Sequence, residues 1–82
     1  AMINAWLIHN QEFDCVHEPA VVHPMAVILA ALLAEVDRRG GARGAEMLLA
    51  LVIAVDIAAS LGSACRTRLR FFRPAQCGAL GA

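Results

Sequence analysis

The residues best able to do chemistry gather in one polar loop, where residues 11–23 read QEFDCVHEPAVVH. Asp14, Cys15, His17 and His23 lie within ten positions of one another. Imidazole, thiol and carboxylate groups are those that proteins use to move protons and to bind metal ions. Either use requires the side chains to be held close together, so the elements around the loop decide which chemistry is open to it.

The spacing of these groups does not favour a metal site. One residue separates Cys15 from His17, five separate His17 from His23, and no second ligand cluster follows. Zinc ligands usually come in regularly spaced pairs. The three cysteines of the chain form no CxxC pair, which favours reduced thiols in a cytoplasmic protein. We therefore expect no metal and no other cofactor, and a cytoplasmic location.

His23 directly precedes Pro24, a residue suited to the first position of a helix. The commonest role of such an imidazole is to cap the helix or to fill the core next to it. His9 and His17 have no stronger claim than surface or core positions. Residue type alone therefore leaves His23 as a candidate and no more.

A second cluster of potential interest is basic and aromatic. Arginines stand at 66, 68, 70 and 73, with phenylalanines at 71 and 72. Arginines among aromatics can bind single-stranded nucleic acid, but four charges make a weak footprint. We expect no nucleic acid partner and a solvated connector instead, in which Arg73 could present a two-pronged donor to a carboxylate.

Helices must position both clusters. Residues 2–10 predict a short helix closed by Asn10 in a left-handed cap, and residues 25–39 predict a longer helix stopped by Gly40. A third helix is expected at 45–61, ended by Gly62, followed by a connector and a small apolar tail. Alanines recur every four residues in both long helices, so we expect an antiparallel hairpin packed along these seams: Ala26, Ala30, Ala34, Ala50, Ala54, Ala58 and Gly62.

Composition indicates a chain whose faces are covered by something else. It has 82 residues, 60% of them hydrophobic, with no Lys and no Tyr. Residues 1–37 carry five acids and no base, and residues 38–82 carry seven arginines and two acids. Asp56 near the middle of the third helix argues against a membrane span. We expect one incomplete helical domain over residues 1–82, completed by a larger enzyme or by other copies of the chain.

The order of these segments resembles the N-terminal all-helical domain of the MmgE/PrpD family, which includes 2-methylcitrate dehydratase, cis-aconitate decarboxylase and iminodisuccinate epimerase. Family members have a helix of the NA..AH type, an acidic DxDDT-like loop, a VHP sequence opening a helix, two further helices and an F-H/R-P-T…GA.GA segment. The corresponding stretches here are NAWLIHNQEFDCVHEPAVVHP, ALLAEVDRRGGARG, EMLLALVIAVDIAASLGSA and FFRPAQCGALGA.

The resemblance implies a metal-independent lyase or isomerase acting on small polycarboxylates. It implies a catalytic role for His23, and carboxylate-binding roles for Asp14 and Arg73. Val16 and Ala75 stand where the family usually has threonines, and the second domain of the family is absent, so we expect no complete activity from this chain. The alternative is a small helical self-association module without catalytic activity.

Overall fold

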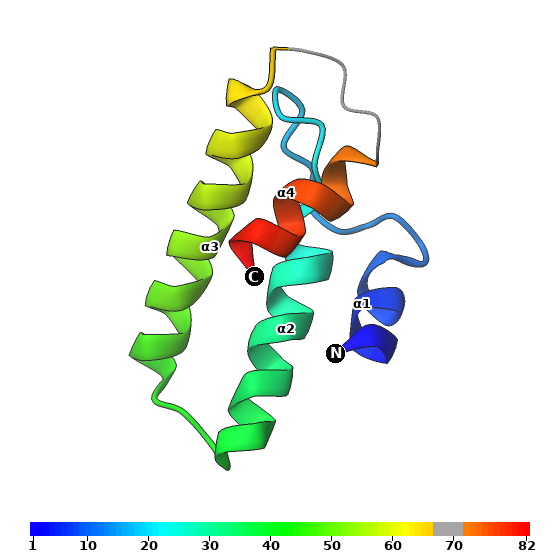
Figure 1. The fold of residues 1–82 in the computed structure, drawn as a ribbon. Helices are drawn as coiled ribbons and strands as arrows, with labels where there is room; N and C mark the ends of the chain where they lie inside the picture. Colours follow the sequence, from blue (N-terminus) through cyan, green and yellow to red (C-terminus); the bar gives the residue numbers. More distant parts are fainter. Residues whose placement is uncertain (67–71) are drawn as a thin grey trace.

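The computed structural model describes residues 1–66 and 72–82, and all regular structure in these ranges is helical. The helices are α1 (Met2–His9), α2 (Pro24–Arg39), α3 (Gly44–Ala64) and α4 (Arg73–Gly81). Figure 1 shows α2 and α3 as an antiparallel pair, with α1 beside α2 and α4 lying across the pair. The prediction of an all-α fold is confirmed.

The ends of α2 follow from its sequence. Pro24 opens the helix, where its missing N–H costs no hydrogen bond. Gly40 ends it in the left-handed region at φ 78°, and the Gly41 amide donates to the Val36 carbonyl at 3.0 Å. A residue without Cβ adopts this backbone readily, which is why the chain turns here.

Other boundaries differ from expectation. Asn10 lies at φ −60°, so the predicted left-handed cap of α1 is wrong. Helix α3 continues past Gly62 to Ala64. A Cβ at Gly62 would lie 2.6 Å from the Cβ of Ala20, so this glycine permits close packing against the loop rather than ending the helix.

Residues 73–81, which were expected to form the end of a connector and a tail, instead form helix α4, which packs against both long helices. A Cβ at Gly78 would meet the side chain of Val27 at 3.0 Å, and one at Gly81 would meet the Ala54 carbonyl oxygen at 2.6 Å. Because α4 lies so close, Ala58 on α3 is fully buried. Ala50, nearer the turn of the hairpin, stays exposed. The predicted seam of α3 is therefore covered at the α4 end only. The predicted seam of α2 is wrong, because Ile28, Ala31 and Leu32 line the groove facing α3, whereas Ala26 lines the hollow beside α1.

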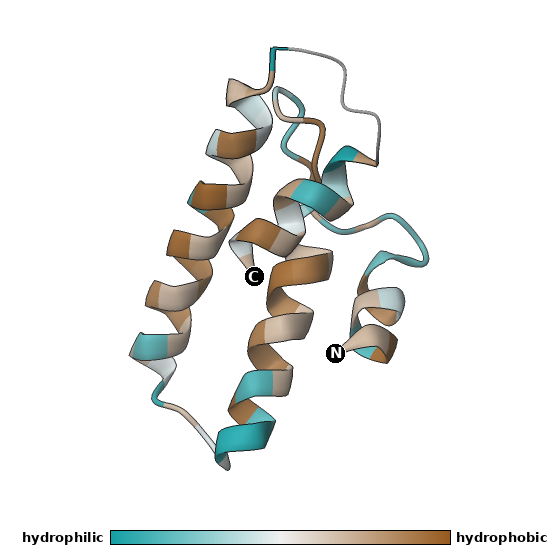
Figure 2. Cartoon of the chain, viewed as in Figure 1, coloured by the Kyte–Doolittle hydropathy of each residue, from teal (hydrophilic) through white to brown (hydrophobic). Residues whose placement is uncertain are grey.

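Large apolar side chains remain exposed on α3 and α1. On α3, Leu48 and Val52 are each 65% exposed, and on α1 Trp6 is 68% exposed. Figure 2 shows the hydrophobic colouring continuing along the outer side of α3. By length and hydropathy alone, α3 is the one helix among the described residues that could cross a membrane, a test that core helices also pass.

Candidate functional site

The carboxylate of Asp14 lies between two imidazoles. Nδ1 of His9 is 2.9 Å from Oδ1 and 3.1 Å from Oδ2 of Asp14. Nδ1 of His23 is 3.5 Å from Oδ2. The two rings meet edge to face, with centroids 4.7 Å apart. These residues form a compact group that we call the His–Asp–His cluster.

Three different segments supply this cluster. His9 is the last residue of α1, Asp14 lies in the following loop, and His23 is the N-cap residue of α2. The cluster therefore ties α1 to the start of α2. Between Asp14 and His23 the chain doubles back, with His17 and Val22 exchanging backbone hydrogen bonds.

The doubled-back loop has its own internal support. Val21 adopts φ 55°, an unusual value for a β-branched residue. The Val21 amide donates to the Glu18 carbonyl, and the Ala20 amide donates to Nδ1 of His17 at 3.2 Å. The imidazole of His17 is thereby engaged within its own loop. Ala20 and Val22 are buried, which anchors the loop to the core.

Burial and charge act in opposite directions on Asp14, whose side chain is only 3% exposed. Burial favours the neutral acid, but the hydrogen bond with His9 and the charge of both imidazoles favour the carboxylate. The hydrogen bond and the two imidazoles together outweigh burial, so the pKa of Asp14 lies below its ordinary value of 3.8. The cluster thus holds an anion that is shielded from water.

His23 faces this anion with an atom that lacks a hydrogen bond. Its Nδ1 is buried and has no hydrogen-bond partner, although 29% of its side chain is exposed. Buried polar nitrogens nearly always have a partner. The ring is therefore neither a core imidazole bonded to backbone nor a freely solvated one. Asp14 and His23, which the sequence analysis predicted to belong to one site, lie next to each other in the structure.

Arg73 has other partners. It is the first residue of α4, and its Nη1 donates to the carbonyl oxygens of Ala20 and Gly62, each at 3.4 Å. These contacts link α4 to the loop and to α3. No contact among the described residues joins Arg73 to the His–Asp–His cluster. Of the other basic residues considered for nucleic acid, Arg68 and Arg70, with Phe71, lie outside the described residues.

His9 is the member that sequence reasoning missed. It stands five residues before Asp14 and fourteen before His23, a separation that no short motif covers. The available signal was a histidine at the expected end of a helix, followed by an acid beyond the turn. His9 also lines a hollow of ≈ 500 Å³ between α1 and α2, together with Trp6 and Glu12. Of the three residues of the cluster, His9 is the one that lines this hollow.

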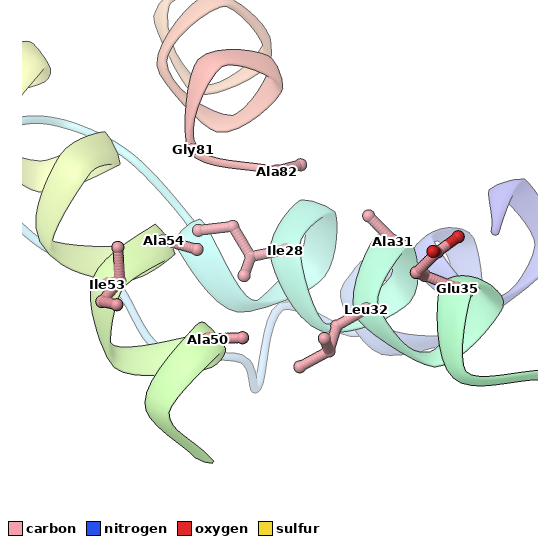
Figure 3. Close-up of a pocket in the computed structure, with 9 residues that line it drawn as sticks. All are labelled: Ile28, Ala31, Leu32, Glu35, Ala50, Ile53, Ala54, Gly81 and Ala82. Carbon is pink, nitrogen blue, oxygen red and sulfur yellow. The ribbon is translucent and has the colours of Figure 1, made fainter. Parts of the chain in front are cut away.

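A separate groove of ≈ 280 Å³ lies between α2 and α3. Figure 3 shows Ile28 and Leu32 of α2 facing Ala50 and Ala54 of α3, with the end of α4 above them. Glu35 is the charged residue of its lining. An apolar groove with one negative charge does not suit a carboxylate ligand.

Comparison with protein families agrees with this all-helical fold. A family model described as the MmgE/PrpD N-terminal domain matches residues 1–82. No curated protein and no solved structure matches the chain. Because the family model covers the full printed sequence, the chain belongs to the MmgE/PrpD family, one of lyase- and isomerase-type enzymes.

Proposed function

We propose that this chain is the helical part of a metal-independent lyase or isomerase that acts on small polycarboxylates. His23 is the acid/base group, and Asp14 and Arg73 belong to the carboxylate site. The observation that carries the proposal is the position of His23, at the N-terminus of α2 and next to the shielded carboxylate of Asp14, in a chain of this family.

The chemistry of such a reaction sets the roles. Removing a proton beside a carboxylate requires a positioned base, a group that stabilises the enolate-like charge, and exclusion of water. The carboxylate of Asp14 lies 3.5 Å from Nδ1 of His23, so a negative charge faces the ring, as one does at a catalytic histidine. The positive end of the α2 dipole favours a bound anion near His23.

The other requirements exceed what this chain provides. Because Asp14 is an anion, its place in the carboxylate site requires a cation or a shared proton between it and the ligand, and one helix terminus cannot offset several negative charges. Arg73 would have to exchange the carbonyl oxygens of Ala20 and Gly62 for a ligand carboxylate. We therefore propose that the chain is catalytically incomplete and needs residues from a second domain to close over the ligand.

A titration monitored by NMR tests the binding part of this proposal. The signals of the His23 ring are followed while citrate or cis-aconitate is added, in the unsubstituted chain and in Arg73→Ala. A weak, saturable shift that disappears in Arg73→Ala is expected. Arg43→Ala is the matched control, because Arg43 pairs with Glu46 at the start of α3. An unchanged His23 signal at millimolar ligand would remove the carboxylate site from this chain.

A second candidate function is self-association without catalysis. The exposed apolar side chains of α1 and α3 favour it, because a monomer leaves them in water. The two candidates differ in what they require: association needs these surfaces and no contribution from His23.

A further inference from the structure

Asp14 faces two imidazoles but is hydrogen-bonded to only one of them. Nδ1 of His9 lies 2.9 Å from Oδ1 and 3.1 Å from Oδ2 of the carboxylate. Nδ1 of His23 lies 3.5 Å from Oδ2 and has no hydrogen-bond partner among the described residues. The buried carboxylate therefore orients the ring of His9, whereas it only faces the ring of His23.

This hydrogen bond decides which nitrogen of His9 carries the proton. Because the pKa of Asp14 lies below its ordinary value, its carboxylate is ionised at neutral pH and can only accept hydrogen bonds. Nδ1 of His9 must then be the donor. In the neutral ring, Nε2 is left without a proton and has a free lone pair. His9 thus has the tautomer that a buried carboxylate imposes on the histidine of a catalytic triad.

The position of His9 leaves Nε2 available for reaction. The side chain of Asp14 is 3% exposed, whereas that of His9 is 39% exposed. Within the described part of the chain, the hydrogen bonds of the His9 ring are those of Nδ1 to Asp14. His9 also lines the hollow between α1 and α2. A proton-transfer group needs a buried carboxylate on one side of its ring and an accessible nitrogen on the other, and this pair supplies both.

We propose that His9 is a second acid/base group of the site and that Asp14 is its positioning residue. This inference rests on the proposed function. Elimination of water from a hydroxy acid takes one proton from carbon and gives one to the departing hydroxyl group. The electron pair of the C–H bond forms the C=C bond as the C–O bond breaks. One imidazole gains a proton, an imidazolium loses one, and water leaves, so the total charge of the two rings is unchanged. With centroids 4.7 Å apart, the rings of His9 and His23 can divide these two transfers.

The ring ¹⁵N signals of the unsubstituted chain, recorded with the imidazoles neutral, report the tautomers directly. His9 should carry its proton on Nδ1. His17 should carry it on Nε2, because its Nδ1 accepts a hydrogen bond from the Ala20 amide, so it serves as the internal reference. In Asp14→Asn the new amide can donate to Nδ1, and the proton of His9 should move to Nε2. Glu18→Gln, at an exposed acid of the same loop, should change neither tautomer. A proton on Nε2 of His9 in the unsubstituted chain would overturn the inference, as would a tautomer that Asp14→Asn leaves unchanged.

The reactivity of Nε2 is measured with diethyl pyrocarbonate, which acylates unprotonated imidazole nitrogens. Mass spectrometry after a brief reaction should locate the modification at His9 in the unsubstituted chain and in Glu18→Gln. The rate should be at least ~10-fold lower in Asp14→Asn, because Nε2 then carries the proton. An unreactive His9, or equal rates in the three chains, would overturn the inference. If citrate leaves the His23 signal unchanged while the results for His9 hold, the carboxylate site fails and the Asp14–His9 pair stands.

Discussion

At the scale of single residues, Asp14 links α1, its loop and α2 by contacts to His9 and His23. The Asp14 side chain is 3% exposed, and the hydrogen bond with His9 replaces part of the water that its carboxylate gives up. Hydrogen bonds to charged groups contribute more than those between neutral ones. The cluster should therefore matter for stability as well as for any binding.

Asp14→Asn tests this structural contribution. It keeps the shape of the side chain and removes the charge, and we expect a loss of about 1.5–3 kcal/mol in the free energy of unfolding. Urea denaturation followed by circular dichroism measures the change. Glu18→Gln is the control, since Glu18 is an exposed acid of the same loop. Equal stability of Asp14→Asn and the unsubstituted chain would show that the cluster does not hold the helices together.

Gly62 offers a second test at this scale. A Cβ there would lie 2.6 Å from the Cβ of Ala20 and 3.1 Å from its carbonyl oxygen. Gly62→Ala should therefore destabilise the chain by about 1–3 kcal/mol through overpacking. Gly44 lies at the start of α3, and a Cβ there would meet no other atom. Gly44→Ala should therefore be neutral or stabilise the chain by up to about 1 kcal/mol. Thermal unfolding of Gly62→Ala and Gly44→Ala measures the two effects. If Gly62→Ala is as stable as Gly44→Ala, the close packing of Gly62 against Ala20 is contradicted.

At the scale of elements, α2 ends in a local ion network. Arg38 and Arg39 both hydrogen-bond to Glu35, from one turn further along the helix. These hydrogen bonds lower the pKa of Glu35 from 4.5 to about 2. The group is exposed to water, so its contribution is small and decreases with salt.

The pH dependence of this network has a defined sign. A depressed pKa stabilises the folded state above the ordinary value of 4.5, and this stabilisation is lost as the pH falls toward 2. The midpoint of thermal unfolding should therefore fall between pH 4.5 and 2 less steeply in Glu35→Gln than in the unsubstituted chain. Asp37→Asn, which removes a charge from the same turn, should keep the original slope. Identical slopes for all three chains would exclude a contribution from the network.

At the scale of the whole molecule, the apolar surfaces of α1 and α3 exceed what the described residues cover. Helix α3 carries exposed Leu48, Leu49, Val52 and Ile53, with Asp56 beyond them. The charge is also divided, with acids in the first half of the chain and arginines in the second. Both features favour association, by apolar burial or by attraction between halves.

Analytical ultracentrifugation at low micromolar concentration should show oligomers. Val52→Glu should shift the equilibrium toward the monomer, and Asp56→Leu should shift it toward the oligomer, because they remove and add apolar area on the same helix. Raising the salt concentration should dissociate an assembly held by charge and leave one held by apolar burial intact. A compact monomer that neither substitution affects would contradict the association surface.

The amino-acid sequence by itself determined α1, α2, most of α3 and the family, but not α4. Alanine and leucine periodicity, Pro24 and Gly40 specify α2 locally, and the order of segments carries the MmgE/PrpD resemblance, because these signals act within a few residues of one another. The sequence also identified Asp14 and His23 as candidate site residues. Tertiary structure alone decided that His9 completes their cluster and that Arg73 bonds to Ala20 and Gly62 instead. It likewise decided that Gly62 serves packing, since a close approach between segments leaves no local pattern in a sequence.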